Sequence, residues 1–377
     1  MFTLTQEQIA IQKMAREFTE KEIIPVAAEY DEQEKFPGPV VQKMWDTGLV
    51  NFTVPQELGG VGLDTVTACV VSEELGRGCA GIATVAAANS LALYPILIAG
   101  TDEQKAKFIP PITTTGKYAA FCLTEPNAGS DAASVATHAQ AVDGGYLLNG
   151  SKCFITNGDV ADLYVVFASV DRSKGLKGLT AFIVPKAEGV STGKKEIKLG
   201  IRASSTVVVN FDNVFVPAEN VLGGVGQGFK VAMQTLDTSR PLIGALSVGV
   251  ARGAYETALK YAKERVQFGQ PIANFQMIQA MLANMATRID ASRLLVWRAA
   301  AMVDKKDAMF AKESAMAKMF ASDTAMDVTT DAVQILGGYG YSREYPVEKY
   351  MRDAKIMQIY EGTNQIQRLV IAGNILR

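Results

Sequence analysis

The sequence predicts a multi-domain α+β protein in which a block of strands is inserted between two helical blocks. Helical patterns occupy the first third of the 377 residues, β-branched and aromatic runs occupy the middle, and helical periodicity returns after residue 228. This order of blocks differs from the regular alternation of an α/β fold. We therefore expect an N-terminal helical domain at residues 1–120, a middle β domain at 121–225 and a C-terminal helical bundle at 226–377.

The N-terminal block is expected to be entirely helical. Residues 5–8 have the residue types of a capping box, and the pattern at 65–75 predicts another helix. The stretch 78–101 carries no charge and resembles a membrane span in length. Because it contains Asn89 and Pro95, we expect a buried core helix instead.

Strands are predicted in the middle block alone. Runs rich in β-branched or aromatic residues alternate there with glycine-containing turns, which is typical of a small barrel or of paired sheets. The runs span 146–150, 153–156, 163–169, 179–184 and 206–211.

Helices are expected again beyond the glycine-rich segment 223–228. Apolar residues recur at helical spacing, so that one face of a long helix stays apolar. These residues are Ile278, Met281, Leu282, Met285 and Ile289.

The scarcity of histidine and cysteine excludes several kinds of chemistry. One histidine and four cysteines do not suit a zinc site with about three to four ligands, and a serine or cysteine nucleophile normally needs a histidine base. Without a C-x-x-C spacing, the thiols are expected to be small buried hydrophobes in a reducing compartment. They are Cys69, Cys79, Cys122 and Cys153, and His138 is expected to be a surface or structural residue.

Charge and the first residues restrict partners and location. The 37 basic and 39 acidic residues give a net charge of -2, so no basic field suits nucleic acid, and no membrane association is expected. Charges such as Lys13 and Arg16 leave no apolar stretch for a secretory signal. We expect a cytoplasmic protein of bacterial type, or a mitochondrial matrix protein if a transit peptide has been removed.

Two glycine-rich segments imitate nucleotide-binding loops. Neither 223–228 nor 337–341 is expected to follow a strand and open a helix inside a βαβ unit, so a Rossmann site is disfavoured. We expect both segments to be turns between helices that use positive φ angles.

Two further segments contain candidate functional groups. Residues 123–131 are dense in small residues, which form either an ordinary junction loop or a set of backbone N–H groups that converge on an anion or a heterocycle. At 359–363 the acid Glu361 interrupts an apolar pattern. It is either an exposed acid at a helix end or a desolvated carboxylate whose raised pKa suits a general base.

Together these segments resemble the motifs of the acyl-CoA dehydrogenases, of the short- to medium-chain, butyryl-CoA dehydrogenase-like type. Five motifs follow one another in the order of that family and extend over essentially the whole chain. They lie at 123–131, 154–158, 264–269, 334–340 and 351–355 with 359–367. The resemblance implies an acyl-CoA dehydrogenase-like fold with an N-terminal helical domain, a middle β-barrel-like domain and a C-terminal four-helix bundle.

The resemblance also implies an FAD site between the β domain and the helices, without a Rossmann fold. One set of residues lines the FAD of its own subunit, and a second set reaches the FAD of a neighbouring subunit, which implies a homotetramer built as a dimer of dimers. The first set is Phe121, Leu123, Thr124, Gly129, Ser130, Phe154, Ile155, Thr156, Thr363 and Gln365. The second set is Arg265, Gln267, Phe268, Gln276, Gln334, Gly337 and Gly338. Relatives often carry tryptophan in place of Phe154.

For the substrate, the resemblance implies a catalytic base and several acyl-CoA contacts. Glu361 corresponds to the base that removes the α-proton of the thioester while the β-hydride goes to FAD, which gives a trans-2-enoyl-CoA. Small residues at 86–88 stand where relatives carry larger or charged ones, so a short- to medium-chain acyl group is expected. The substrate contacts are expected at Ser130, Asp237, Arg240 and Gly362.

The resemblance implies that an electron-transfer flavoprotein accepts the electrons, and it implies no metal site. Two alternatives use the same scaffold: an enoyl-CoA reductase that works in the reverse direction within an electron-bifurcating complex, and a dehydrogenase for a branched or cyclic acyl-CoA. An acyl-CoA oxidase and a catalytically silent binding protein are further alternatives.

Overall fold

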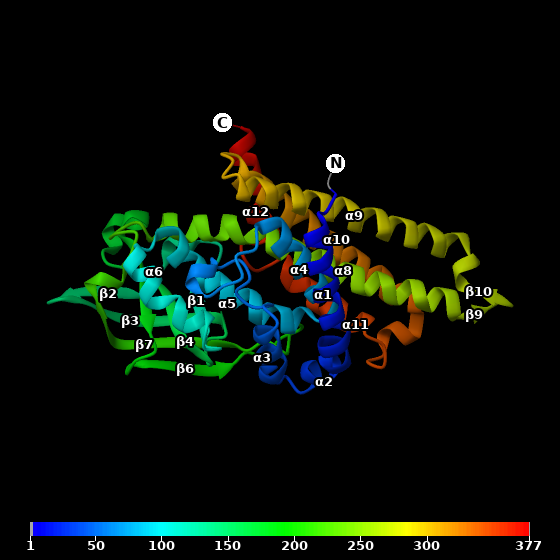
Figure 1. Ribbon diagram of the computed structural model, residues 1–377, viewed down its shortest axis with the longest axis horizontal. Helices are drawn as coiled ribbons and strands as arrows, with labels where there is room; N and C mark the ends of the chain where they lie inside the picture. The colour runs from blue at the N-terminus through cyan, green and yellow to red at the C-terminus, as the bar shows by residue number, and fades with distance from the viewer. Residues whose placement is uncertain (1–2, 377) are drawn as a thin grey trace.

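The computed structural model describes residues 3–376 and has the expected order of helices, strands and helices (Figure 1). At Thr5 the predicted capping box is confirmed, since its hydroxyl accepts from the N–H of Gln8 and its own N–H donates to the Gln8 side chain. The N-terminal helices are α1 (Gln6–Phe18), α2 (Ala27–Glu32), α3 (Gly38–Asp46), α4 (Thr65–Gly78), α5 (Ala80–Ala99), α6 (Asp102–Phe108) and α7 (Pro110–Thr113).

Helix α5 is the uncharged segment that resembles a membrane span, and it is a core helix as predicted. Within residues 3–376 it is the one helix with the length and hydropathy to cross a membrane, yet 67% of its most apolar stretch is buried in the protein. Its polar Asn89 is buried because the side chain donates to Asn51 Oδ1 (3.0 Å) and accepts from the N–H of Ala119 (2.6 Å). The helix packs on α8 and β1.

Eight strands form one mixed sheet that is folded into two halves. The order is β6-β7-β3-β2-β4-β5-β8, and β1 pairs in parallel with β4. Strands β2 and β4 pair only at His138 and Ser169, so the halves separate there. The strands are β1 (Tyr118–Cys122), β2 (His138–Val142), β3 (Gly145–Thr156), β4 (Ala161–Ser169), β5 (Leu179–Pro185), β6 (Val190–Lys195), β7 (Thr206–Pro217) and β8 (Val221–Leu222).

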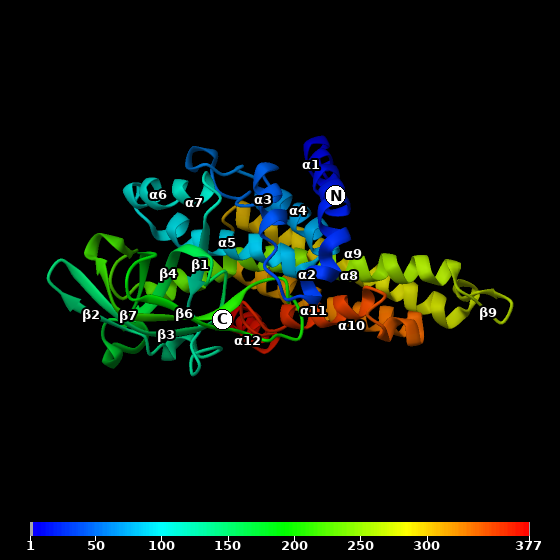
Figure 2. The same cartoon turned by 90° about the horizontal axis from the view of Figure 1, so that it is seen from below.

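Strand β4 shows how alternation builds two cores. Leu163 and Phe167 pack in a cluster with α5, α6, α7 and α8, whereas Tyr164 and Val166 pack between the two halves of the sheet. Figure 2 shows α6 and α7 lying on one side of the sheet. Every second residue of a strand faces the same side, so one buried strand serves both layers.

The sheet differs from the prediction in two ways. The runs at 146–150 and 153–156 belong to one strand, β3, which passes through Gly150 with a shift of register. A Cβ at Gly150 would lie 2.7 Å from the Thr137 hydroxyl, so glycine is required for close approach rather than for a turn. Strands β1, β2, β6 and β8 were not predicted, and the C-terminal part holds two more short strands, so strands are not confined to the middle block.

The C-terminal helices form the predicted bundle, in which α8 packs on α9, α10 and α11. Leu282, Met285 and Ile289 are buried on one face of α9, as expected. A small hairpin joins α8 to α9 at the end of the molecule opposite the sheet (Figure 1). The elements are α8 (Gly228–Glu264), β9 (Val266–Gln267), β10 (Gln270–Pro271), α9 (Gln276–Asp304), α10 (Phe310–Leu336), α11 (Val347–Met357) and α12 (Asn364–Ile375).

The two glycine-rich segments have different surroundings. Residues 223–228 follow strand β8 and lead into α8, so the prediction of a turn between two helices is wrong there. Strand β8 pairs antiparallel with β5, so the segment is not part of a βαβ unit. Residues 337–341 do lie between α10 and α11, and Gly337 has the expected positive φ of 60°.

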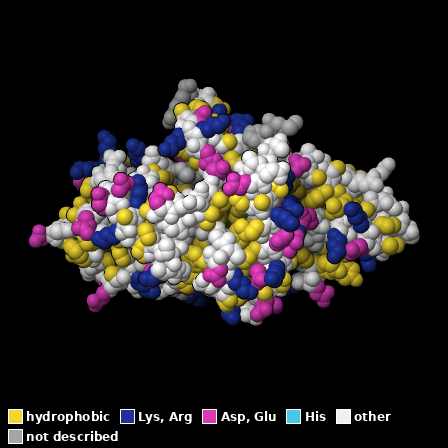
Figure 3. All heavy atoms as spheres, viewed as in Figure 1, with side chains coloured by type: hydrophobic (Ala, Val, Ile, Leu, Met, Phe, Trp, Pro, Cys, Tyr) yellow, Lys and Arg dark blue, Asp and Glu magenta, His cyan; other side chains and the backbone are white. Residues whose placement is uncertain are grey.

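The single histidine and the cysteines have the predicted environments. His138 is exposed on β2, where its Nδ1 lies 3.2 Å from the carbonyl oxygen of Ser169. All four cysteines are free and buried. Acidic and basic side chains are interspersed on the face of the molecule shown in Figure 3. The division of the chain at residues 121 and 226 stays a prediction.

Candidate functional site

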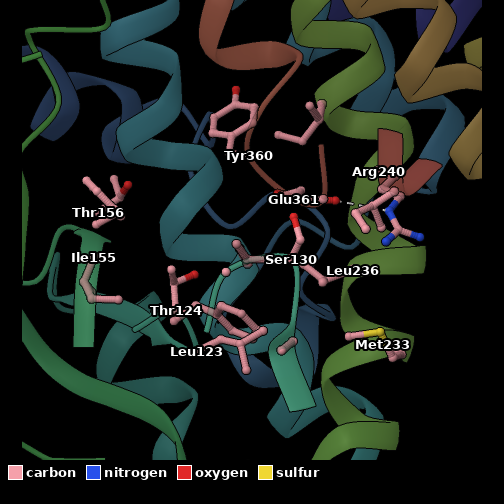
Figure 4. A pocket seen from close by; sticks show the side chains of 18 of the residues that line it. Leu123, Thr124, Ser130, Ile155, Thr156, Met233, Leu236, Arg240, Tyr360 and Glu361 are labelled. Carbon is pink, nitrogen blue, oxygen red and sulfur yellow. Dashed lines mark hydrogen bonds between the residues drawn. The ribbon is translucent and has the colours of Figure 1, made fainter. Parts of the chain in front are cut away.

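A cavity of about 390 Å³ lies where the sheet meets α5, α8 and the segment that precedes α12 (Figure 4). A second cavity of about 590 Å³ opens from the same place toward residues 196–201 and α11. Both cavities contain residues predicted from the sequence, which come from segments far apart in the chain. The shared lining is Thr124, Gly129, Ser130, Phe154, Thr156, Tyr360, Glu361 and Gly362.

One wall of the first cavity comes from α8. Met233, Leu236, Arg240 and Ile243 recur at spacings of three and four residues, so they share one face of the helix. Only Arg240 of these was predicted, although the spacing from it identifies the others. The opposite wall contains side chains of α5, including Ala87 and Ala88 but not Ala86, and they are Thr84, Ala87, Ala88 and Leu91.

A buried ion pair fixes the loop that supplies Thr124 and Ser130. Lys152 of β3 has an exposed fraction of 0%, and its Nζ donates to Glu125 Oε1 (2.6 Å) and to the carbonyl oxygen of Leu123 (3.1 Å). Burial alone would raise the pKa of the Glu125 carboxyl, but Lys152 and three further donors hold that pKa below its ordinary value. The donors are the N–H groups of Ala136 and Thr137 and the Thr137 hydroxyl.

Glu361 occupies a strained turn at the centre of the site. Its φ angle is 54°, which is uncommon outside glycine, and Gly362 follows with a φ of 90°. The Ser239 hydroxyl donates to Glu361 Oε2 (2.5 Å). The backbone carbonyl of Glu361 accepts from Arg240 Nε (3.3 Å) and Gln367 Nε2 (3.1 Å). Hydrogen bonds therefore hold both the carboxylate and the backbone of Glu361 in place.

The electrostatics of Glu361 suit a base. Glu361 is half-buried and lines the cavity, and burial of the carboxyl raises its pKa to about 6, although Ser239, Arg240 and Lys318 act in the opposite direction. Of the two sequence alternatives for Glu361, the raised pKa agrees with the desolvated carboxylate. Ser239, Lys318 and Gln367 were not predicted as neighbours of this group.

The remaining predicted residues are divided between the cavities and the surface. Phe121, Leu123 and Ile155 line the first cavity and Thr363 lines the second, where it also caps α12. Asp237 lines neither but pairs with Arg240. Gln365 lines no described cavity.

A third cavity of about 590 Å³ lies at the far end of α8, away from Glu361. Arg265, Gln267, Gly337 and Gly338 line it together, whereas Gln276 and Gln334 do not. In the neighbouring hairpin the Phe268 ring has an exposed fraction of 94%. These residues do not meet the Glu361 cavity within one chain.

Three family models match successive parts of the chain. Models of the N-terminal, middle and C-terminal domains of acyl-CoA dehydrogenases match residues 5–116, 120–214 and 226–376. The short-chain specific acyl-CoA dehydrogenase of Clostridium acetobutylicum is 47% identical over 378 residues, covering 100% of both chains. The chain belongs to the acyl-CoA dehydrogenase family.

Solved structures of acyl-CoA dehydrogenase relatives agree over the full length. The butyryl-CoA dehydrogenase of Megasphaera elsdenii is 45% identical with a TM-score of 0.97, covering 100% of both chains. A chain from work on the electron transferring flavoprotein of Acidaminococcus fermentans and flavin-based electron bifurcation is 47% identical, again with a TM-score of 0.97 and 100% coverage of both chains.

Acyl-CoA dehydrogenases are oxidoreductases that use FAD, and the cavity suits a flavin. Figure 4 shows Thr124, Thr156 and Ser130 on the side of the sheet, opposite Met233 and Arg240 of α8. Phe154, with a φ of 57° and an exposed fraction of 64%, adds an aromatic face beside these hydroxyl groups. A Cβ at Gly129 would meet no atom within 4 Å. The site thus combines hydroxyl groups for the polar edge of a flavin, an aromatic side chain for its apolar face, and free space at Gly129.

Proposed function

We propose that this acyl-CoA dehydrogenase oxidises short- to medium-chain acyl-CoA thioesters to trans-2-enoyl-CoA, with Glu361 as the catalytic base. One observation carries the proposal: a carboxylate with a raised pKa lies in a cavity that combines an apolar wall with a hydroxyl-lined edge. A proton next to a thioester carbonyl is weakly acidic, so its removal needs a positioned base.

Each group around Glu361 has a defined task in this reaction. The carboxylate removes the α-proton, and a pKa of about 6 makes it a stronger base than an ordinary glutamate while leaving it ionised at neutral pH. The hydrogen bond from the Ser239 hydroxyl to Oε2 restricts the rotation of the carboxylate. Arg240 and Gln367 hold the backbone of the turn through its carbonyl oxygen. FAD, when bound, supplies the acceptor for the β-hydride.

The acyl chain and the thioester are assigned to opposite parts of the first cavity. Small side chains of Ala87 and Ala88 on α5, together with Leu236 and Ile243 of α8, provide an apolar path for the chain. We assign contacts with the rest of the acyl-CoA to Ser130, Asp237, Arg240 and Gly362, of which all but Asp237 line this cavity. A branched or cyclic acyl group is the alternative substrate.

The FAD contacts are proposed in two sets. Phe121, Thr124, Phe154 and their neighbours in the first predicted set hold the flavin of their own subunit. The second set, from Arg265 to Gly338, reaches a neighbouring subunit's FAD in a homotetramer. Its separation from the Glu361 cavity and the exposure of Phe268 support this division, because these residues do not meet that cavity within one chain.

We propose an electron-transfer flavoprotein as the electron acceptor and a cytoplasmic location. The structure of the Acidaminococcus relative comes from work on such a flavoprotein, and relatives of this length occur in bacteria.

An anaerobic titration of the FAD-loaded protein with acyl-CoAs of increasing length tests the proposal. We expect butyryl-CoA or octanoyl-CoA to bleach the flavin band near stoichiometric amounts, and Glu361→Gln to abolish bleaching while FAD stays bound. An FAD-loaded protein that no acyl-CoA bleaches would contradict the assignment, and full activity in Glu361→Gln would show that the base is another residue.

The reverse reaction, reduction of an enoyl-CoA, is the second candidate, and the link of the Acidaminococcus chain to electron bifurcation favours it. In this case the protein would co-purify with a flavoprotein, and NADH would drive enoyl-CoA reduction by the pair. Absence of NADH-driven reduction with a loaded partner would exclude the reverse direction.

A further inference from the structure

Lys318 of α10 lies directly behind the turn that carries Glu361. Its side chain has an exposed fraction of 0%, and it is one of the largest fully buried side chains of the protein. Its Nζ donates to the carbonyl oxygen of Gly362 and to Asn364 Oδ1, both at 2.9 Å. Among residues 3–376 no carboxylate oxygen lies within 4.0 Å of this ammonium group.

Hydrogen bonding does not explain why a lysine is buried here. The carbonyl oxygen of Gly362 also accepts from Gln367 Nε2 (2.9 Å), and Asn364 Oδ1 also accepts from Ser322 Oγ (3.2 Å). Both acceptors therefore keep a donor if the ammonium is removed. Burying a cation without a carboxylate partner costs free energy that an apolar side chain of the same size avoids.

The charges around Glu361 show where this cation acts. Arg240 is already neutralised, since it pairs with Asp237, and Asp323 pairs with Arg368. Within residues 3–376 Lys318 forms no ion pair of its own, and the negative charge of Glu361 favours its protonated form. The ionisable groups that interact with Glu361 are Arg240 from α8, Lys318 from α10, Tyr94 from α5 and Tyr360 from its own segment. Asp237 and Asp323 interact with the two cations, Arg240 and Lys318.

We propose that Lys318 is a positioning residue for catalysis, whose buried charge keeps the Glu361 carboxylate ionised and ready to accept the α-proton. It depends on the proposed function only for the identity of the base. An acid that must stay ionised inside a largely apolar site is stabilised in its ionised form by a nearby cation. Burial lowers the pKa of Lys318 itself to about 7, so this lysine is mostly charged at pH 6 and loses its charge at higher pH.

Lys318→Met in the FAD-loaded enzyme tests the proposal, because methionine keeps an unbranched apolar chain and loses the charge. Removing a cation disfavours the carboxylate, so the acid limb of the flavin-bleaching rate should move up by about 0.5 to 1 pH unit. At pH 6 the rate should fall about two- to fivefold, because the ionised fraction of Glu361 falls by that factor, and at pH 9 it should approach that of the natural protein. The midpoint of thermal unfolding should stay or rise, since an unpartnered buried charge is removed.

Two variants serve as controls. Lys318→Arg keeps the positive charge and should keep the acid limb near its natural position. Lys312→Met makes the same change earlier in α10, where the lysine pairs with Glu313, and should leave the pH profile unchanged. A merely structural role for Lys318 would lower the thermal midpoint in Lys318→Met without moving the acid limb, and that result would overturn the proposal.

A second measurement does not depend on turnover. The infrared band of the protonated Glu361 carboxyl, identified by subtracting the spectrum of Glu361→Gln, should titrate at higher pH in Lys318→Met than in the natural protein. Equal titration would overturn the role of Lys318 even if the enzyme is active. A natural protein that fails to bleach with any acyl-CoA would contradict the proposed function instead, so the two failures are distinct.

Discussion

Two buried lysines of this protein, Lys152 and Lys318, have the same exposed fraction of 0% but opposite electrostatic surroundings. Lys152 contacts a carboxylate at 2.6 Å, and the pair is surrounded by the loop that it fixes. Lys318 contacts only a carbonyl and an amide oxygen, and the nearest catalytic acid lies across a turn. The neutralised charge organises the backbone, whereas the unneutralised one influences ionisation nearby.

The comparison shows that burial alone does not indicate the role of a charge. Glu125 has a pKa below its ordinary value because Lys152 and several N–H groups compensate burial. Glu361 has a pKa above its ordinary value because burial exceeds the combined effect of its hydrogen bond and the cations. Mutation of the structural pair, Lys152 and Glu125, should therefore change the free energy of unfolding. Mutation of the catalytic pair, Lys318 and Glu361, should change the pH dependence of the reaction.

Breaking the structural pair should have the largest effect on stability. Lys152→Met leaves the buried Glu125 carboxylate without its cation, so the free energy of unfolding should fall by about 3 to 5 kcal/mol and FAD should be retained poorly. Urea unfolding and the bound-flavin absorbance measure the two effects. The double variant Lys152→Met/Glu125→Gln removes the unpaired charge and should recover part of the loss; equal losses in both variants would contradict the pairing argument.

Removing the catalytic acid should have a smaller effect on stability, of opposite sign. The Glu361 carboxyl ionises from about pH 4.5 when unfolded but only from about pH 6 when folded, so its contribution to stability is lost as pH rises through this window. Glu361→Gln should therefore be more stable by about 1 to 2 kcal/mol at pH 8. Unfolding curves at pH 4 provide the control, since the two proteins should have equal free energies of unfolding at that pH. A difference independent of pH would exclude ionisation as the cause.

Loss of one hydrogen bond should give the smallest change. Ser239→Ala removes the donor to Glu361 Oε2, so the acid limb of the bleaching rate should rise by about 0.5 to 1 pH unit without a large loss of stability. Ser247→Ala on the same helix removes a hydroxyl that bonds only to the carbonyl of Ile243 and should leave the limb in place. An unshifted limb in Ser239→Ala would mean that water replaces the hydroxyl.

Local patterns predicted most of the fold, and the exceptions have local causes. The apolar face of α9 and the capping box at Thr5 depend on neighbouring residues, so they are visible in the sequence. Strand β1 was missed because Tyr118–Cys122 contains two alanines and no β-branched residue. Strand β6 was missed because it is an exposed edge strand with Gly193 and two lysines, which resembles a loop.

The site was predictable where one segment carries the chemistry. Glu361 stands in an apolar pattern, so a desolvated carboxylate was one of the two alternatives that the sequence allowed. The proximity of Lys318 and Ser239 to Glu361 was not predicted, because each resembles an ordinary polar residue of a helix. Their proximity to Glu361 depends on how α8 and α10 pack beside the turn before α12, which is a contact between segments distant in the sequence.

Helix α5 has a consequence for the synthesis of this protein. Much of its apolar surface is covered by α8, whose last residue is Glu264, so the covering helix leaves the ribosome long after Ala99 does. At typical elongation rates this interval lasts roughly 10 to 30 s. During that time the growing chain presents a helix that resembles a membrane segment, and it should then depend most on chaperones that shield apolar surface. Slowing translation between α5 and α8 should increase aggregation of an otherwise stable enzyme.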